Sequence, residues 1–155
     1  MKFGTIFTKR CLVKRISTQD ATPRYLSWLQ DKEIKKNLAY SNIIKLKQLK
    51  SYIKRNVTDR NTLFLKICLK NNTHIGNIKI HKINKKKRSA FLGILIGEKK
   101  NWNLGIAQEI IHNVSNHLYK KFGISKIFLR VNTKHKNAII AYQKSGFIFL
   151  EKYKK

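Results

Sequence analysis

The segment that most constrains the fold is an apolar run followed by a loop and an amphipathic helix. Residues Ala90–Ile96 are almost all apolar, which is typical of a central strand buried on both faces. Gly97 ends this strand, and the loop after it leads into Gly105–Tyr119, where apolar residues recur at helical spacing. Because such a strand and helix must pack on further elements to bury their apolar faces, we predict an α/β protein with a mixed sheet.

Further elements are predicted on the N-terminal side of this unit. Thr22-Pro23 reads as a helix N-cap followed by the first helical residue, and Lys47–Arg55 has one apolar side that predicts a second helix. Leu63–Leu69 alternates as strands do, and His74–Ile80 follows a turn at Asn71-Asn72. These two segments therefore predict a β-hairpin.

The C-terminal part continues the alternation. Lys126–Val131 predicts a strand, Lys136–Lys144 a helix and Phe147–Leu150 a last strand. A short turn is expected at Gln30–Glu33, after the first helix. The chain has 155 residues, one proline and no Pro/Gly/Ser-rich linker, so we expect a single domain over residues 1–155.

The charge of the chain is its most unusual bulk property. Thirty-five Lys and Arg residues against seven Asp and Glu give a formal net charge of +28. A field of this size attracts polyanions such as nucleic acid, anionic surfaces and nucleotide cofactors. The lysines are scattered, with tight clusters only at Lys85–Arg88 and Lys152–Lys155. Biased composition therefore stays open as the alternative to selection for a polyanionic partner.

The remaining bulk features favour a cytoplasmic protein without disulfides. Cys11 and Cys68 lie within alternating apolar stretches, which predicts buried strand residues rather than a disulfide or a metal pair. The apolar stretch at the N-terminus is too short for a signal peptide, and Ala90–Ile96 is far too short to span a membrane. The histidines show no metal-ligand spacing, so no metal is expected.

The loop before the long helix has the chemistry of a phosphate site. A helix N-terminus presents unpaired N–H groups and the positive end of a dipole. Gly105 and Ala107 are small enough for the backbone to approach an anion closely, and Lys99 and Lys100 add positive charge. Taken alone the pattern also suits an ordinary helix start, in which Gly105 only permits a turn.

Four segments in the same order resemble the GNAT acetyltransferase family. The loop Trp102–Ala107 is similar to the family's Gln/Arg-x-x-Gly-x-Gly/Ala pyrophosphate loop, and Asn137–Phe147 is similar to its terminal helix with a Tyr and a Gly-Phe end. His74–Ile78 resembles its third strand, and Tyr25–Ile34 resembles the entry segment of the RimJ/RimL-like branch. The resemblance covers most of the chain.

This resemblance implies a fold and a cosubstrate. The fold would be a mixed, mostly antiparallel central sheet flanked by helices, with splayed fourth and fifth strands. Acetyl-CoA would be the cosubstrate, with its pantetheine arm on the strand edge and its pyrophosphate in the loop. The residues assigned to its binding are Ile94, Leu95, Ile96, Trp102, Asn103, Leu104, Gly105, Ile106, Ala107, Asn132 and His135.

The catalytic residues are assigned less completely. Tyr142 matches the tyrosine that acts as general acid in many family members, although an aromatic residue on an amphipathic helix can equally be a core residue. Phe91 stands about where some members carry a glutamate base, which leaves Glu98, Glu33 and His135 as candidates for the base. We assign Glu98 to the catalytic site, and we expect Glu109 on the solvent face of its helix.

Two positions depart from the loop pattern. Trp102 replaces the usual Gln or Arg, and Asn103 stands at the first glycine position, where asparagine tolerates left-handed backbone better than most residues. A degenerate module that binds acyl-CoA without catalysis is therefore one alternative. A basic nucleic-acid- or ribosome-associated protein on the same scaffold is another, although the chain has no nucleic-acid-binding motif.

The resemblance predicts direct transfer of acetyl to a primary amine and leaves the acceptor open. Relatives in this branch suggest a protein N-terminus or an amino-sugar or nucleotide-sugar. The positive charge favours an anionic acceptor over a polycation such as spermidine, which would be repelled. A monomer or a homodimer is expected, the dimer through an exposed edge at Phe147–Leu150.

Overall fold

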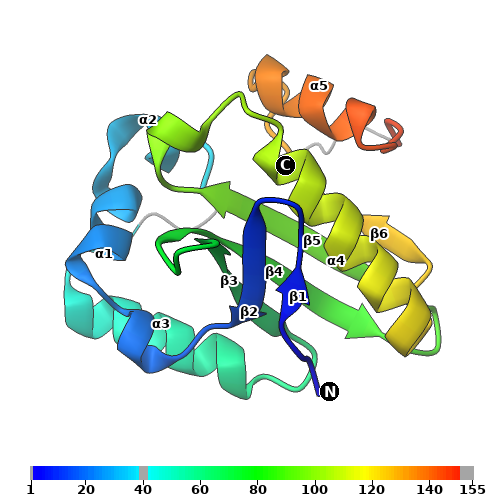
Figure 1. Cartoon of the computed structure of the whole chain (residues 1–155), viewed down its shortest axis with the longest axis horizontal. Helices are drawn as coiled ribbons and strands as arrows, with labels where there is room; N and C mark the ends of the chain where they lie inside the picture. Colours follow the sequence, from blue (N-terminus) through cyan, green and yellow to red (C-terminus); the bar gives the residue numbers. More distant parts are fainter. Residues whose placement is uncertain (1, 39–41, 151–155) are drawn as a thin grey trace.

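One six-stranded sheet, with its strands in sequence order, organises the molecule (Figure 1). The computed structural model describes residues 2–38 and 42–150. Neighbouring strands from the first to the fifth run antiparallel, and the last pair runs parallel, as predicted for a mixed sheet. The strands are β1 (Ile6–Phe7), β2 (Cys11–Arg15), β3 (Leu63–Leu69), β4 (His74–Asn84), β5 (Ser89–Ile96) and β6 (Lys126–Phe128).

Helices pack on both faces of this sheet. Strand β3 shows how the faces separate, because Phe64 packs with α1 (Pro23–Gln30) and α3 (Leu46–Thr58) while its neighbours Leu63 and Leu65 pack with α4 (Ile106–Phe122). Figure 1 shows α4 lying across β4 and β5. The helices are α1 (Pro23–Gln30), α2 (Lys32–Lys35), α3 (Leu46–Thr58), α4 (Ile106–Phe122) and α5 (Lys136–Lys144), with short 3-10 turns η1 (Thr18–Asp20) and η2 (Lys99–Asn101).

The start of α1 follows its sequence signals. Thr22 accepts a hydrogen bond from the Tyr25 N–H at 3.2 Å, and Pro23 occupies the first helical position. The predicted turn at 30–33 is wrong in part, since Asp31 caps a further helix, α2. The Asp31 carboxylate accepts from the N–H groups of Glu33 and Ile34. This arrangement fixes the direction in which the Asp31 side chain leaves the backbone.

The predicted last strand is wrong. Phe147–Leu150 forms no strand, and Ile148, Phe149 and Leu150 are 85%, 68% and 70% exposed. Its β propensity is real, but a strand also needs a neighbouring edge to hydrogen-bond with. That neighbour, β6, covers Lys126–Phe128 rather than the predicted Lys126–Val131. The strand edge from which a homodimer was expected is therefore not formed by these residues.

Strand β5 is less buried than its composition predicted. Gly93 is exposed, and Ile94, Leu95 and Ile96 are only half-buried. The reason is the pairing with β6, which joins Ser89–Phe91 to Lys126–Phe128 and extends no further. Beyond Phe91 the described part of β6 offers β5 no partner. The two strands therefore splay apart, as the family resemblance implied.

Candidate active site

The loop after β5 ends in an uncapped helix N-terminus. Asn103 and Gly105 are both left-handed, with φ of 60° and 78°, so asparagine does adopt that conformation here. Counted from Trp102, however, the first glycine position of the loop pattern falls on Gly105, so the assignment of that position to Asn103 was wrong. Gly105 is the N-cap of the 17-residue helix α4, and no described side chain caps it. The first N–H groups of α4, including those of Ile106 and Ala107, therefore stay available to an anion.

Trp102 fastens this loop to the end of β5. Its Nε1 donates to the Ile96 carbonyl at 2.7 Å, and its ring packs against the apolar cluster of α1 and α3. The Ile96 carbonyl is therefore already occupied. The role that the structure gives Trp102 is to hold the loop, which is compatible with its predicted place in the cosubstrate site.

The open edge of β5 presents the backbone of Ile94. The Gly97 N–H donates to the Ile75 carbonyl of β4 at 2.7 Å, so Gly97 points its backbone groups toward β4. Backbone groups alternate along a strand, so those of Leu95 also face β4, while those of Ile94 and Ile96 face the splayed side. Trp102 occupies the Ile96 carbonyl, whereas among residues 2–38 and 42–150 no side chain bonds to the backbone of Ile94.

Tyr142 lies in the apolar cluster that also contains Ile94 and Ile96. Its ring meets Phe147 edge to face, with centroids 6.1 Å apart. Burial raises the pKa of the Tyr142 hydroxyl above its ordinary value of 10. The phenol is therefore protonated across the neutral range, and α5 carries a proton donor on the α4 side of the sheet.

A cleft of about 380 Å³ lies between α1, α2 and the start of the loop. Gly97 is one wall, and the Trp28 indole lies so close that a Cβ on Gly97 would be 2.0 Å from Trp28 Cδ2. Glu98 is fixed at this wall, because its carboxylate accepts from Trp28 Nε1 at 3.2 Å and Arg24 Nη1 at 3.1 Å. The lining residues are Ser27, Trp28, Asp31, Ile34, Gly97, Glu98, Lys99 and Lys100.

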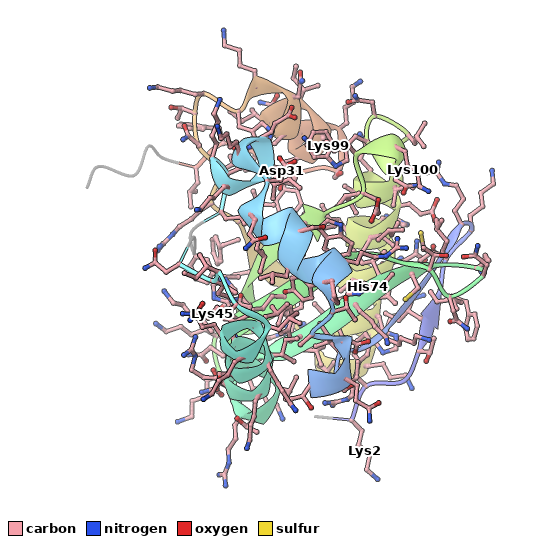
Figure 2. The ribbon with its side chains drawn as sticks, turned by 90° about the vertical axis from the view of Figure 1, so that its left-hand side faces the viewer. Lys2, Asp31, Lys45, His74, Lys99 and Lys100 are labelled. Atoms are coloured by element: carbon pink, nitrogen blue, oxygen red, sulfur yellow. The ribbon has the colours of Figure 1, made fainter. Side chains whose placement is uncertain are left out.

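Carboxylates gather at this cleft in an otherwise basic chain. Lys99 Nζ contacts Asp31 Oδ2 at 2.8 Å and Glu33 Oε2 at 3.1 Å, and Figure 2 shows Asp31 and Lys99 side by side. The hydrogen bond from Lys99 is the main reason why the pKa of Asp31 is lowered. Three of the chain's seven acidic residues, Asp31, Glu33 and Glu98, thus lie in or beside the cleft. Lys99, predicted to serve the phosphate loop, is paired with two of them.

The comparison with family models decides the family. Residues 10–148 match the acetyltransferase (GNAT) domain, which is most of the chain. The chain belongs to the GNAT acetyltransferase family. It is therefore an acetyl-CoA-dependent N-acetyltransferase, as the sequence predicted. No match was found among curated protein sequences.

Solved structures share the fold of this GNAT protein. Spermidine N-acetyltransferase from Vibrio cholerae, in complex with CoA and spermine, has a TM-score of 0.79 at 17% identity, covering 89% of this chain and 80% of that one. RimL, a ribosomal L7/L12 alpha-N-protein acetyltransferase in complex with coenzyme A, has a TM-score of 0.81 at 9% identity, covering 92% of this chain and 82% of that one. Microcin C7 self immunity acetyltransferase MccE, in complex with acetyl-CoA and AMP, has a TM-score of 0.78 at 16% identity, covering 90% of this chain and 79% of that one.

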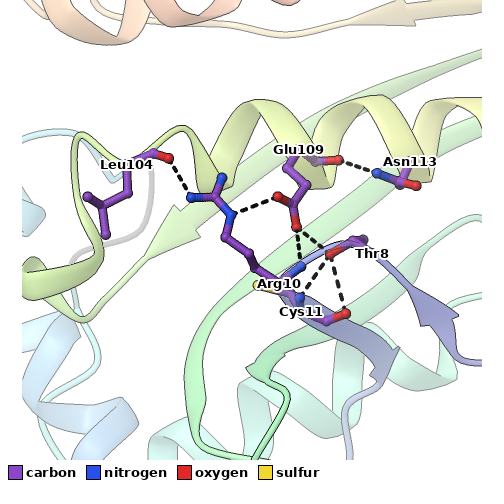
Figure 3. Close-up of polar contacts among 6 residues, drawn as sticks. All are labelled: Thr8, Arg10, Cys11, Leu104, Glu109 and Asn113. Atoms are coloured by element: carbon purple, nitrogen blue, oxygen red, sulfur yellow. Dashed lines mark hydrogen bonds and ion pairs between the residues drawn. The ribbon is translucent and has the colours of Figure 1, made fainter.

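One residue of this GNAT domain was placed wrongly from sequence. Glu109 was expected on the solvent face of its helix, but its side chain is only 13% exposed (Figure 3). It accepts from Thr8 Oγ1 at 2.6 Å and from Arg10 Nε at 2.8 Å. Burial is the largest influence on its pKa and raises it, but the hydrogen bonds from Thr8 and Arg10 outweigh burial, so the pKa lies below 4.5.

Asn132 and His135 lie in the turn before α5. The Asn132 side chain accepts from the Lys134 N–H at 2.9 Å, its carbonyl accepts from the His135 N–H at 2.9 Å, and His135 is the N-cap of α5. Among the described residues, no hydrogen bond joins either of them to the loop 102–107. Their predicted contact with acetyl-CoA therefore stays a prediction.

The other expectations about bound groups concern metals, membranes and cysteines. Among residues 2–38 and 42–150, no group of three or more His, Cys, Asp or Glu side chains could hold a metal ion. No helix in the same residues is long and apolar enough to cross a membrane. Cys11 and Cys68 are free and buried in β2 and β3, as predicted.

Proposed function

We propose that this acetyltransferase transfers acetyl to a primary amine by direct attack, at the gap between β5 and β6. The observation that carries the proposal is the backbone of Ile94, which faces the splayed side beyond the last β5–β6 pair and has no partner strand there in the described part of the chain. An extended pantetheine arm can add to such an edge as an extra strand does. The pyrophosphate would lie at the N–H groups of Ile106 and Ala107.

The same edge suits the reacting carbonyl. The amine nitrogen attacks the thioester carbon, and negative charge develops on its oxygen. A backbone N–H that is already oriented stabilises this oxyanion at no cost of reorganisation. Of the N–H groups on the splayed side of β5, we assign the oxyanion contact to that of Ile94.

Tyr142 is proposed as the general acid. When the carbon–sulfur bond breaks, the thiolate of CoA must take up a proton. A thiol has a pKa of about 8.5 and a free phenol of about 10, so the transfer is uphill, and the burial that raises the pKa of Tyr142 makes it more so. Burial keeps the Tyr142 phenol protonated for this step. A degenerate, non-catalytic module would have no need of such a proton donor.

Glu98 is proposed to receive the proton of the attacking amine, directly or through water. Free amines are mostly protonated near pH 7, so the acceptor must lose a proton before it attacks. Phe91, at the position expected for a base, lies against Phe128 with ring centroids 5.5 Å apart and carries no carboxylate. Glu98 directly follows the end of β5 and Gly97, and Trp28 and Arg24 hold its carboxylate at the cleft wall.

The charge at the cleft bears on the acceptor. Arg24 and Lys99 pair with the three carboxylates at the cleft and Lys100 also lines it, so the local charge is close to balance. The cleft therefore lacks the excess positive charge that would attract the phosphates of a nucleotide-sugar, and its carboxylates can pair with a cationic amine. Of the two acceptors expected from sequence, we propose a protein N-terminus or a similar cationic amine. The names of RimL and of the spermidine acetyltransferase fit this class.

The nucleic-acid hypothesis predicts one basic face. Figure 2 instead shows lysines on several sides, with Lys2, Lys45 and Lys100 at different edges of the molecule. Such a spread favours the composition-bias interpretation of the +28 charge. We therefore retain acetyl transfer as the proposed function.

Calorimetry with acetyl-CoA at low and high salt tests the proposal, with Gly105→Trp as the variant. We expect saturable binding that keeps most of its affinity in salt and is lost in the variant, because the indole would fill the space at the helix N-terminus. Binding that vanishes with salt, or that ignores the substitution, would mean that bulk charge alone attracts the ligand. Rates with an N-terminal peptide, a polyamine and an amino-sugar then identify the acceptor.

A further inference from the structure

Arg10 reaches from the β1–β2 turn to the first turn of α4 (Figure 3). Its Nε donates to Glu109, and its Nη1 donates to the Leu104 carbonyl at 2.7 Å. Its remaining nitrogen, Nη2, lies 3.6 Å from the position that a Cβ on Gly105 would take. The guanidinium therefore lies beside the residue that opens the proposed phosphate site.

The bond to Leu104 controls the direction of a neighbouring N–H group. A trans peptide is planar, so the Leu104 carbonyl and the Gly105 N–H point in opposite directions. Gly105 populates positive and negative φ about equally, so the peptide before it can turn over at little cost unless something holds it. Arg10 Nη1 holds this carbonyl and thereby directs the Gly105 N–H away from Arg10.

Arg10 is itself held at several points. Glu109 accepts from Arg10 Nε and, through its other oxygen, from the Arg10 N–H at 2.9 Å. Thr8, which is 6% exposed, donates to that same oxygen and accepts from the Cys11 N–H at 3.0 Å. A carboxylate in the first turn of α4 would by itself compete with a bound phosphate for the helix dipole. Its contacts give it a different effect, which is to fix the guanidinium.

We propose that Arg10 is a positioning residue for the phosphates of CoA, held by Glu109 and Thr8. It acts by fixing the peptide between Leu104 and Gly105, and the direction of its forked side chain matters more than its charge. The inference rests on the proposed binding of CoA at the N-terminus of α4. It predicts that a residue of the N-terminal hairpin sets affinity for the phosphate part of the ligand.

Calorimetry with two probes tests this role. CoA carries the phosphates and pantetheine carries none, so only CoA should respond to the loop. We expect Arg10→Lys and Arg10→Gln each to weaken CoA binding by about tenfold or more, the usual effect of losing a charge-assisted hydrogen bond, with pantetheine affinity unchanged. Lys9→Gln removes the neighbouring exposed charge and is the matched control, expected to bind CoA as the wild type does.

A Glu109→Ala variant separates positioning from simple charge. Removing a negative charge beside an anion site should tighten CoA binding if only Coulomb forces act. The proposal expects weaker binding, because Arg10 loses its support. Full affinity in Arg10→Lys, tighter binding in Glu109→Ala, or equal losses for CoA and pantetheine would each overturn it. If Gly105→Trp also left CoA affinity intact, the proposed site itself would fail, which is a different result.

Discussion

Gly97 lies under the indole of Trp28, and we predict that Gly97→Ala destabilises the protein strongly. The added methyl would lie 2.0–2.4 Å from three atoms of the Trp28 ring, far inside van der Waals contact. Trp28 is 3% exposed and has little room to move. Overpacking of this kind costs about 1–3 kcal/mol, and a disturbed hydrogen bond to the Glu98 carboxylate costs about 1.5–3 kcal/mol.

Together these costs have a central value of about 4 kcal/mol, which at about 2–4 °C per kcal/mol for a domain of this size lowers the melting temperature by about 8–16 °C. Differential scanning calorimetry measures this, with Gly93→Ala as the control. Gly93 lies in β5, four residues before Gly97, and nothing lies within 4 Å of a Cβ built there. The reasoning would be refuted if Gly97→Ala melted within about 1 °C of the wild type, or if Gly93→Ala lost as much stability.

Three further predictions concern single side chains. Tyr142→Phe should lower kcat by about 10²–10⁴-fold with little change in acetyl-CoA affinity. Because the pKa of Tyr142 is raised, the pH–rate profile of the wild type should show no fall in kcat from ionisation of Tyr142 below about pH 10. Because the folded-state pKa of Glu109 is lowered, its stabilisation is present above about pH 4.5 and is lost as pH falls through the folded pKa. In Glu109→Gln the melting temperature should therefore fall less steeply as pH is lowered below about 4.5. Asp31→Asn should raise KM for a cationic acceptor while the exposed control Asp59→Asn does not, and an unchanged KM would argue against the cationic-acceptor proposal.

Most elements of the fold could be predicted from local signals in the sequence. The cap at Thr22-Pro23 and the left-handed Asn103 are properties of one or two residues, so they could be predicted without a partner. The strand Leu63–Leu69 was predicted within its observed bounds because alternation is also local. The small residue at the start of α4 is equally visible in the chain itself, but its assignment to a pyrophosphate loop came from the family resemblance and stays a prediction.

Features that depend on distant partners were missed. Glu109 was placed on the solvent face because a helical pattern shows only which side is polar, and its partner Arg10 lies 99 residues earlier. Phe147–Leu150 has strand-forming residues, but the structure provides no strand beside it. The apolar run Ala90–Ile96 was taken as fully buried, although apolar composition does not say whether protein or ligand covers a surface.

The contact between Arg10 and Glu109 also has a consequence for how the protein is made. Arg10 contacts a loop that is synthesised about a hundred residues later. The loop therefore reaches its final form only after α4 has been made and the β1–β2 hairpin has docked on it. Ligand bound at the loop should in turn slow hydrogen exchange at the backbone of Arg10 and Cys11. Changes in the β1–β2 hairpin should therefore alter the conformation of the loop before α4.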